Sequence, residues 1–226
     1  MENQKSIWFI TLMLSAVAGY CDTVTFISAG SIFSAHVTGN FIVFAYQIIK
    51  GSEVEAWIKL LTFPVFIISV IIGGAVAARS INRYKILLIE GILLIISGLI
   101  SILFIHKPGL ICETYTVVMM VVFAMGLQNA FGKLYAKETF GPTTMMTGNV
   151  TQASLDLGNT IGSSFKDLVS VQSLKKQSVT IGGFLIGCLA GALLAKSFGL
   201  SVIILPGLGM IICYFTTDKN APVTAA

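Results

Sequence analysis

Long runs of apolar residues are the feature that most restricts what this 226-residue chain can fold into. A helix that spans the hydrocarbon core of a bilayer needs roughly 20 mostly apolar residues. The six good candidates are residues 7–30, 56–78, 85–105, 116–136, 179–195 and 200–215. Two further segments, 34–49 and 143–161, are shorter or more polar than a lipid-facing span should be. The pattern predicts an all-α integral membrane protein with nearly the whole chain inside the bilayer.

Composition supports this class and excludes others. Charged residues make up 11% of the chain, against about 25% in an average soluble domain, and no polar helix faces are present to cover a soluble core. The net charge of +4 fits loops that lie against anionic lipid. No basic cluster interleaved with aromatic residues indicates nucleic acid. The four cysteines lack metal-type or redox spacing, so we expect no metal and no cofactor.

Three motifs occur twice, in the same order and with nearly the same spacing. Residues 19–22 (GYCD) correspond to 126–129 (GLQN), 34–40 (SAHVTGN) to 143–149 (TTMMTGN), and 74–80 (GAVAARS) to 191–197 (GALLAKS). This duplication indicates two membrane repeats, residues 1–108 and 109–226, within one membrane domain. The run Ala16-Val17-Ala18 could end a signal peptide. We favour a retained helix, because cleavage would remove from the first copy a helix that the second copy keeps.

The placement of basic residues bears on the number of crossings, because cytoplasmic loops carry excess Lys and Arg. If all eight segments cross, six basic residues lie outside and eight inside. If segments 34–49 and 143–161 are re-entrant, ten lie inside and four outside, namely Lys50, Lys59, Lys107 and Lys196. We therefore predict two inverted repeats, each with three crossing helices plus one short re-entrant or half helix, in a bacterial inner membrane. Inverted repeats are common in secondary transporters.

Asp22 lies well inside the first apolar segment, where ionisable residues are energetically expensive and usually functional. A carboxylate in a low-dielectric environment favours its protonated form, which suits reversible proton binding. Asp22 is therefore the candidate for a coupling-ion or proton site. The alternative is a structural Asp that hydrogen-bonds the backbone of the Thr-Gly-Asn segment, a role that its counterpart Asn129 could fill in the second copy.

The Thr-Gly-Asn elements lie near the starts of the two short segments. A helix that begins inside the membrane presents free N–H groups and the positive end of its dipole, which suits an anion or carboxylate. Thr and Asn add side-chain donors and acceptors, and Gly permits close backbone approach. Close helix packing without ligand contact is the alternative interpretation. The predicted substrate-binding residues, which include a polar pair opposite Cys21 and Asp22, are Thr38, Gly39, Asn40, Gln128, Asn129, Thr147, Gly148 and Asn149.

Other polar residues receive mainly structural interpretations. Glu90, five residues after Lys85, is expected to extend towards the membrane interface. His36 aligns with Met145 and is expected to be structural. Lys133 is expected to extend to the interface or to counter Asp22.

Two helical patterns suggest further contacts. Gln152 and Asp156 lie one turn apart and could extend a polar lining. Gly183, Gly187 and Gly191 show the small-residue spacing that lets helices approach closely, within the protomer or in a homodimer.

Together, the motifs at 19–23 (GYCDT), 36–40 (HVTGN), 126–130 (GLQNA) and 143–149 (TTMMTGN) resemble the YoaK-like family. This is a large family of small bacterial membrane proteins grouped as a domain of unknown function. The resemblance covers nearly the whole chain and implies a multi-spanning inner-membrane protein, without a substrate. The chain departs from the family pattern at Lys133, where the family has Arg, a residue with a planar, bidentate head group.

These features favour a secondary transporter or channel for a small polar solute, with a small anion or carboxylate as the preferred class. The substrate site would lie at the repeat interface near the bilayer midplane. The expected partners are the solute and membrane lipids, and the small-residue faces are compatible with a homodimer. A membrane scaffold or regulatory protein is the alternative. An enzyme is least favoured, because no Ser/His/Asp set or paired acidic motif is present, and Asp22, His36 and Glu90 are isolated from one another in the sequence.

Overall fold

The computed structural model describes residues 2–51, 53–104 and 111–217, and its regular elements are all helical over these residues. The elements, in chain order, are α1 (Glu2–Ser28), α2 (Gly39–Ile49), α3 (Glu53–Arg79), α4 (Lys85–Phe104), α5 (Ile111–Leu134), η1 (Ala136–Glu138), α6 (Met146–Gly162), α7 (Leu168–Phe198), η2 (Gly199–Ile203) and α8 (Ile204–Thr216). The predicted all-α class is confirmed. The boundary proposed between residues 108 and 109 lies outside the described residues.

Five helical stretches of the described chain are long and apolar enough to span a membrane: Ser6–Ser28, Val54–Arg79, Lys85–Leu103, Thr114–Leu134 and Leu168–Thr216. The fifth contains both C-terminal spans predicted from the sequence. These spans are separated by a bend at Gly199 rather than by a loop, since Gly199 has φ +60°, a conformation that glycine adopts without steric strain. The two segments interpreted as half helices form the shorter helices α2 and α6.

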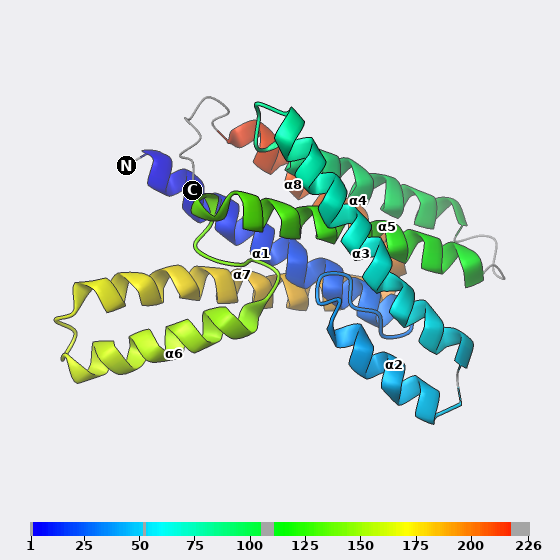
Figure 1. Ribbon diagram of the computed structural model, residues 1–226, viewed down its shortest axis with the longest axis horizontal. Coiled ribbons are helices and arrows are strands. Elements are labelled where there is room, and N and C mark those ends of the chain that lie inside the picture. Colours follow the sequence, from blue (N-terminus) through cyan, green and yellow to red (C-terminus); the bar gives the residue numbers. More distant parts are fainter. Residues whose placement is uncertain (1, 52, 105–110, 218–226) are drawn as a thin grey trace.

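The chain turns back on itself before each short helix. After α1, residues 29–38 return beside α1, and α2 then runs towards the end of the molecule at which α1 finished (Figure 1). After α5, residues 139–145 return in the same way, and α6 runs towards the opposite end. In Figure 1 the α2 end and the α6 end therefore lie at opposite ends of the long axis.

Small residues set the main helix crossings. Gly183, Gly187 and Gly191 of α7 all face the backbone of α1; a Cβ at Gly191 would lie 2.8 Å from the carbonyl oxygen of Tyr20. The predicted close packing is thus made within the protomer. On the other side of the molecule, α3 packs on α5, where a Cβ at Gly126 would lie 2.7 Å from Cβ of Ser69.

The crossing of α4 and α8 is reciprocal. A Cβ at Gly91 would lie 3.0 Å from the carbonyl oxygen of Gly207, and a Cβ at Gly207 would lie 2.8 Å from the carbonyl oxygen of Gly91. Any larger residue at either position would therefore meet the opposite backbone. The two helices approach each other as closely as their main chains allow.

The exterior is apolar and polar groups are gathered inside. Large hydrophobic side chains face outwards all along the bundle, among them Ile42 on α2, Ile71 on α3 and Leu193 on α7, which are 76%, 65% and 75% exposed. Asp22, Asn40, Glu90 and Gln128 are buried. This distribution is the one expected for helices that face lipid.

We expect Gly187→Ala to destabilise the protein, because its methyl group would lie only 2.8 Å from the carbonyl carbon of Ala16 on α1. Overpacking of this kind costs about 1–3 kcal/mol and would lower the Tm in detergent by several degrees. Gly182→Ala on the same helix is the matched control. Its Cβ would enter open space, so the Tm should stay level or rise slightly. An equal loss in both variants would contradict the packing described.

Candidate functional site

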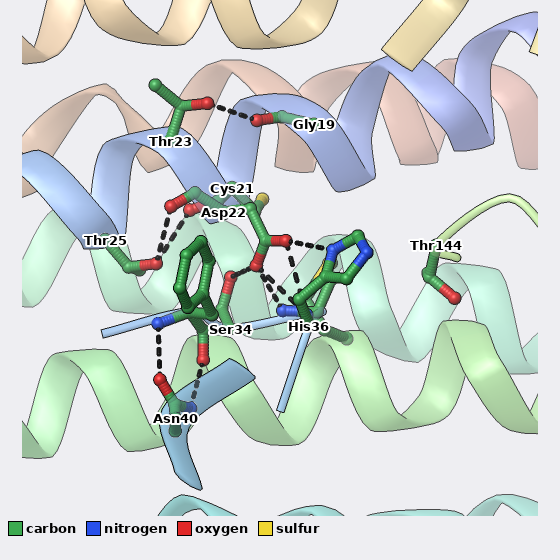
Figure 2. A network of polar contacts seen from close by, with 12 residues as sticks. Gly19, Cys21, Asp22, Thr23, Thr25, Ser34, His36, Asn40 and Thr144 are labelled. Carbon is green, nitrogen blue, oxygen red and sulfur yellow. Dashed lines mark hydrogen bonds and ion pairs between the residues drawn. The ribbon is translucent and has the colours of Figure 1, made fainter. Parts of the chain in front are cut away.

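Asp22 forms the centre of a buried polar network between α1 and the segment 29–38 (Figure 2). One carboxylate oxygen, Oδ1, accepts hydrogen bonds from the backbone N–H of Ala35 at 2.5 Å and from the Ser34 hydroxyl at 3.3 Å. The other, Oδ2, lies 3.2 Å from the backbone nitrogen of His36 and 2.8 Å from its Nδ1. An ionised carboxylate is an acceptor with room for all of these donors. The geometry is that of the structural alternative considered for Asp22, although the bonded residues are 34–36 rather than Thr-Gly-Asn.

The turn that brings residues 34–36 back to Asp22 depends on left-handed backbone conformations. Gly30 has φ +63° and Ser31 has φ +65°. Glycine adopts this region freely, whereas a serine there is uncommon and must be held by its surroundings. The reversal therefore lies immediately after α1, and it places His36 against a residue 14 positions earlier in the chain.

Asn40 closes the other side of this turn. Its side-chain amide donates to the carbonyl oxygen of Phe33 and accepts from the backbone N–H of Phe33, both at 2.8 Å, and it also donates to the Thr62 hydroxyl on α3 at 3.0 Å. Asn149 makes an equivalent closure, since its amide donates at 2.7 Å to the carbonyl oxygen of Pro142, again seven residues earlier. The asparagines of both Thr-Gly-Asn elements thus hold the turn that precedes their helix.

Gln128 and Asn129 hold the second turn as Asp22 holds the first. Gln128 donates to the Thr143 hydroxyl at 3.0 Å and to the carbonyl oxygen of Leu14 at 2.8 Å. Asn129 accepts from the Thr144 hydroxyl at 2.7 Å. The Oε1 atom of Gln128 is buried without a hydrogen-bond partner, so this residue retains capacity to accept another bond.

The remaining predicted substrate residues lie in two settings. Thr38, Thr147 and Gly148 are exposed, and Gly39 is half-buried. The expectation of free N–H groups at the start of α2 is wrong: those of Gly39 and Asn40 donate to the carbonyl oxygens of His36 and Val37. A tight turn runs directly into the helix and uses these donors. The substrate-binding role of the eight residues stays a prediction.

The contacts of His36 differ most from those expected from the sequence. The sequence separates it from Asp22, whereas the structure joins them through a hydrogen bond. This bond raises the pKa of His36 above its ordinary value of 6.5, and the carboxylate charge acts in the same direction, while partial burial opposes it. The imidazole also makes an edge contact with the ring of Phe184 on α7, at 5.8 Å between centroids.

A cavity of about 680 Å³ opens beside this pair. It lies between α1, α2 and α7, and its wall is largely apolar. The residues around it are Asp22, Thr23, Phe26, Phe33, His36, Gly39, Ile42, Val43, Phe184 and Cys188. Among the predicted site residues, Asp22 and Gly39 line it. Its volume falls within the range of small-molecule pockets.

The structure corrects the expected position of Glu90 and decides between the two positions considered for Lys133. Glu90 does not extend to an interface, because it is completely buried within the bundle. Apolar residues flank Glu90 on both sides in the sequence, and this pattern could have predicted its burial. Lys133 is exposed rather than paired with Asp22.

Gln152 and Asp156 on α6, which the sequence suggested could extend a polar lining, donate and accept a hydrogen bond of 2.9 Å between their side chains. Asp156 is buried, and its Oδ2 atom has no hydrogen-bond partner. Gln152 is exposed, and neither residue lines the cavity beside Asp22.

Comparison with known proteins identifies the family of this chain. A family model described as "Protein of unknown function (DUF1275)" matches residues 10–216, which confirms the resemblance noted from the motifs. No curated protein and no solved structure matches the chain.

We expect the contact between His36 and Asp22 to make stability depend on pH. The pKa of His36 is higher in the folded chain than its ordinary value of 6.5, so the folded state binds a proton that the unfolded state releases. The stability that this contact contributes is complete below about pH 6.5 and is lost as pH rises through the higher, native pKa. The Tm in detergent should therefore fall across this range.

His36→Met, which introduces the residue of the second copy, should remove this component of the pH dependence, and Asp22→Asn should weaken it. A parent whose Tm profile between pH 5.5 and 8.5 coincides with that of His36→Met would contradict the prediction.

Proposed function

We propose that this chain, which belongs to the DUF1275 family of proteins of unknown function, is a secondary transporter or channel for a small polar solute. A small anion or carboxylate is the preferred solute class, and the site lies at the interface of two inverted repeats near the bilayer midplane. The observation that carries the proposal is the cavity beside Asp22 and His36, at a point where the helical path is broken inside the molecule. Broken helices at such positions form the substrate sites of many transporters.

The helix packing supports an inverted relationship between the repeats. Under the sequence correspondence, α1 to α4 are equivalent to α5 to α8. The observed contact of α1 with α7 then has its counterpart in that of α5 with α3, and α2 on α3 has its counterpart in α6 on α7. The crossing of α4 with α8 corresponds to itself, in agreement with the reciprocal contacts of Gly91 and Gly207.

The same arrangement supports a re-entrant course for α2 and α6. Three segments lie at one end of the molecule. They are the first turns of α1, the α3–α4 connection and the α5–α6 connection. Arg83 lies 3.2 Å from Glu138, and the backbone N–H of Phe140 donates to the Thr11 hydroxyl at 3.1 Å. With α2 and α6 re-entrant, the topology predicted from the sequence assigns ten of the 14 Lys and Arg residues to the side of the membrane on which these segments lie, as expected of a cytoplasmic face.

The cavity suggests which part of a solute binds where. Phe26, Phe33 and Phe184 offer apolar contact, and His36 adds a polar group that is positive when protonated. A small polar solute with a short apolar body fits such a surface. A non-transporting scaffold or regulator is the alternative, supported by the internal hydrogen bonds that already occupy Asp22 and Asn40.

Cysteine labelling distinguishes a re-entrant α2 from a crossing one. Lys50 follows α2 and is exposed, whereas Lys59 is buried inside α3, so Lys50→Cys is the test position. In a Cys112→Ser background we expect a membrane-impermeant maleimide to label Lys50→Cys on intact cells. Lys196→Cys should be labelled, and Lys166→Cys protected, in both topologies. Protection of Lys50→Cys until the cells are permeabilised would mean that α2 crosses the membrane.

Uptake into proteoliposomes tests the function itself. We expect radiolabelled uptake of at least one solute from a panel of small carboxylates, inorganic anions, amino acids and nucleobases. Val43→Phe fills the cavity and should reduce that uptake at least tenfold. Ile49→Phe on the same helix, where Ile49 is 88% exposed outside the cavity, should leave uptake unchanged. If no solute enters, or if both variants behave alike, the scaffold alternative gains support.

A further inference from the structure

Glu90 is a carboxyl group without a partner in the interior of the bundle. It lies on α4, its side chain is fully buried, and neither carboxylate oxygen has a hydrogen-bond partner among the described residues. Asp22, by contrast, receives hydrogen bonds from Ser34, Ala35 and His36. The two buried acids are therefore in opposite situations: the interior stabilises a charge on Asp22 and offers nothing to a charge on Glu90.

Among the described residues, no Lys or Arg side chain interacts electrostatically with Glu90. The titratable groups that interact with it electrostatically are the thiols of Cys21 on α1 and Cys213 on α8, both fully buried. Neither η2 nor the described buried face of α5, which also pack on α4, carries an ionisable side chain. Arg79, at the end of α3, is exposed. A bare carboxylate in such a place is strongly disfavoured, and a buried acid of this kind keeps its proton.

Glu90 also lies at the point where the two repeats meet. The next residue, Gly91, makes the reciprocal backbone contact with Gly207 on α8. The Glu90 side chain is 0% exposed, and at the adjacent crossing a Cβ would lie only 2.8–3.0 Å from the opposite carbonyl oxygen, so the packed helices shield the carboxyl group from water. Ionisation of Glu90 therefore requires α4 and α8 to separate, so that water can solvate the carboxylate.

We propose that Glu90, rather than Asp22, is the proton-binding residue of this protein. In the packed state its carboxyl group holds a proton. When the α4–α8 crossing opens, the O–H bond breaks, the proton passes to water and the carboxylate remains solvated. Coupling of this step to solute movement rests on the transport function proposed above, whereas the protonated state of Glu90 does not.

Infrared spectroscopy of the protein in liposomes tests the proposal without a known solute. A protonated carboxyl group gives a C=O stretching band that is separate from the bands of carboxylates. We expect the parent to show this band at neutral pH, with slow exchange in heavy water because the site is shielded. The band should be lost in Glu90→Gln and retained in Glu55→Gln, which changes an exposed acid on α3. Absence of the band from the parent, or its persistence in Glu90→Gln, would overturn the proposal.

Two further measurements sharpen the result. Glu90→Leu removes the buried polar group and should fold with a Tm at or above that of the parent; it also replaces Glu90→Gln in the infrared comparison if the amide variant does not fold. A large loss of Tm in Glu90→Leu would indicate instead that Glu90 is charged and bound to an unseen partner.

Addition of sodium chloride at constant pH should leave the acid band unchanged. Loss of the acid band on this addition would identify a sodium site. An acid band in a protein that takes up no solute would uphold the proton site and refute the transport function.

Discussion

The structure depends on how it satisfies two stretches of non-helical backbone inside an apolar body. Residues 29–38 and 139–145 carry N–H and C=O groups that helical hydrogen bonds pair only in part, and in such surroundings each unpaired group is energetically expensive. Side chains on the preceding and on the following helix hydrogen-bond each turn. Asp22 and Asn40 hold the first turn, and Asn129 and Asn149 hold the second. With these turns fixed, α2 and α6 can begin in the middle of the molecule, and the long helices can pack around them.

This explains why the sequence predicted the elements well and the contacts less well. Apolar length sets the long helices, and α2 begins at Gly39, inside its Thr-Gly-Asn motif. The contact of Asp22 with His36 requires the reversal at Gly30 and Ser31, which no periodic pattern encodes. The burial of Glu90 depends on α5, η2 and α8 packing on α4, and η2 and α8 are distant from α4 in the chain. The environment of a residue could be predicted from the sequence where its own helix provides it. It could not be predicted where helices distant in the chain enclose the residue.

Close packing through glycine links these polar features mechanically. The crossings of α1 with α7 and of α4 with α8 bring backbone against backbone at their glycines, so the helices cannot move nearer at these points. If a buried group beside such a contact becomes charged, we expect the two helices to move apart as rigid bodies, because closely packed helices cannot adjust locally. The buried carboxyl group beside Gly91 therefore lies where a change of protonation can act on the interface of the two halves.

The two copies of the sequence motif differ in the polar groups that hold their turns. Both copies keep the asparagine that closes the turn, but the first has Asp22 with His36 where the second has Asn129 with Met145. A neutral asparagine holds the second turn with hydrogen bonds alone, which shows that architecture does not require a charge at this position. The carboxylate and imidazole of the first copy therefore exceed what the fold needs. Since the cavity of about 680 Å³ adjoins this pair, the additional polar groups of the first copy lie at its wall.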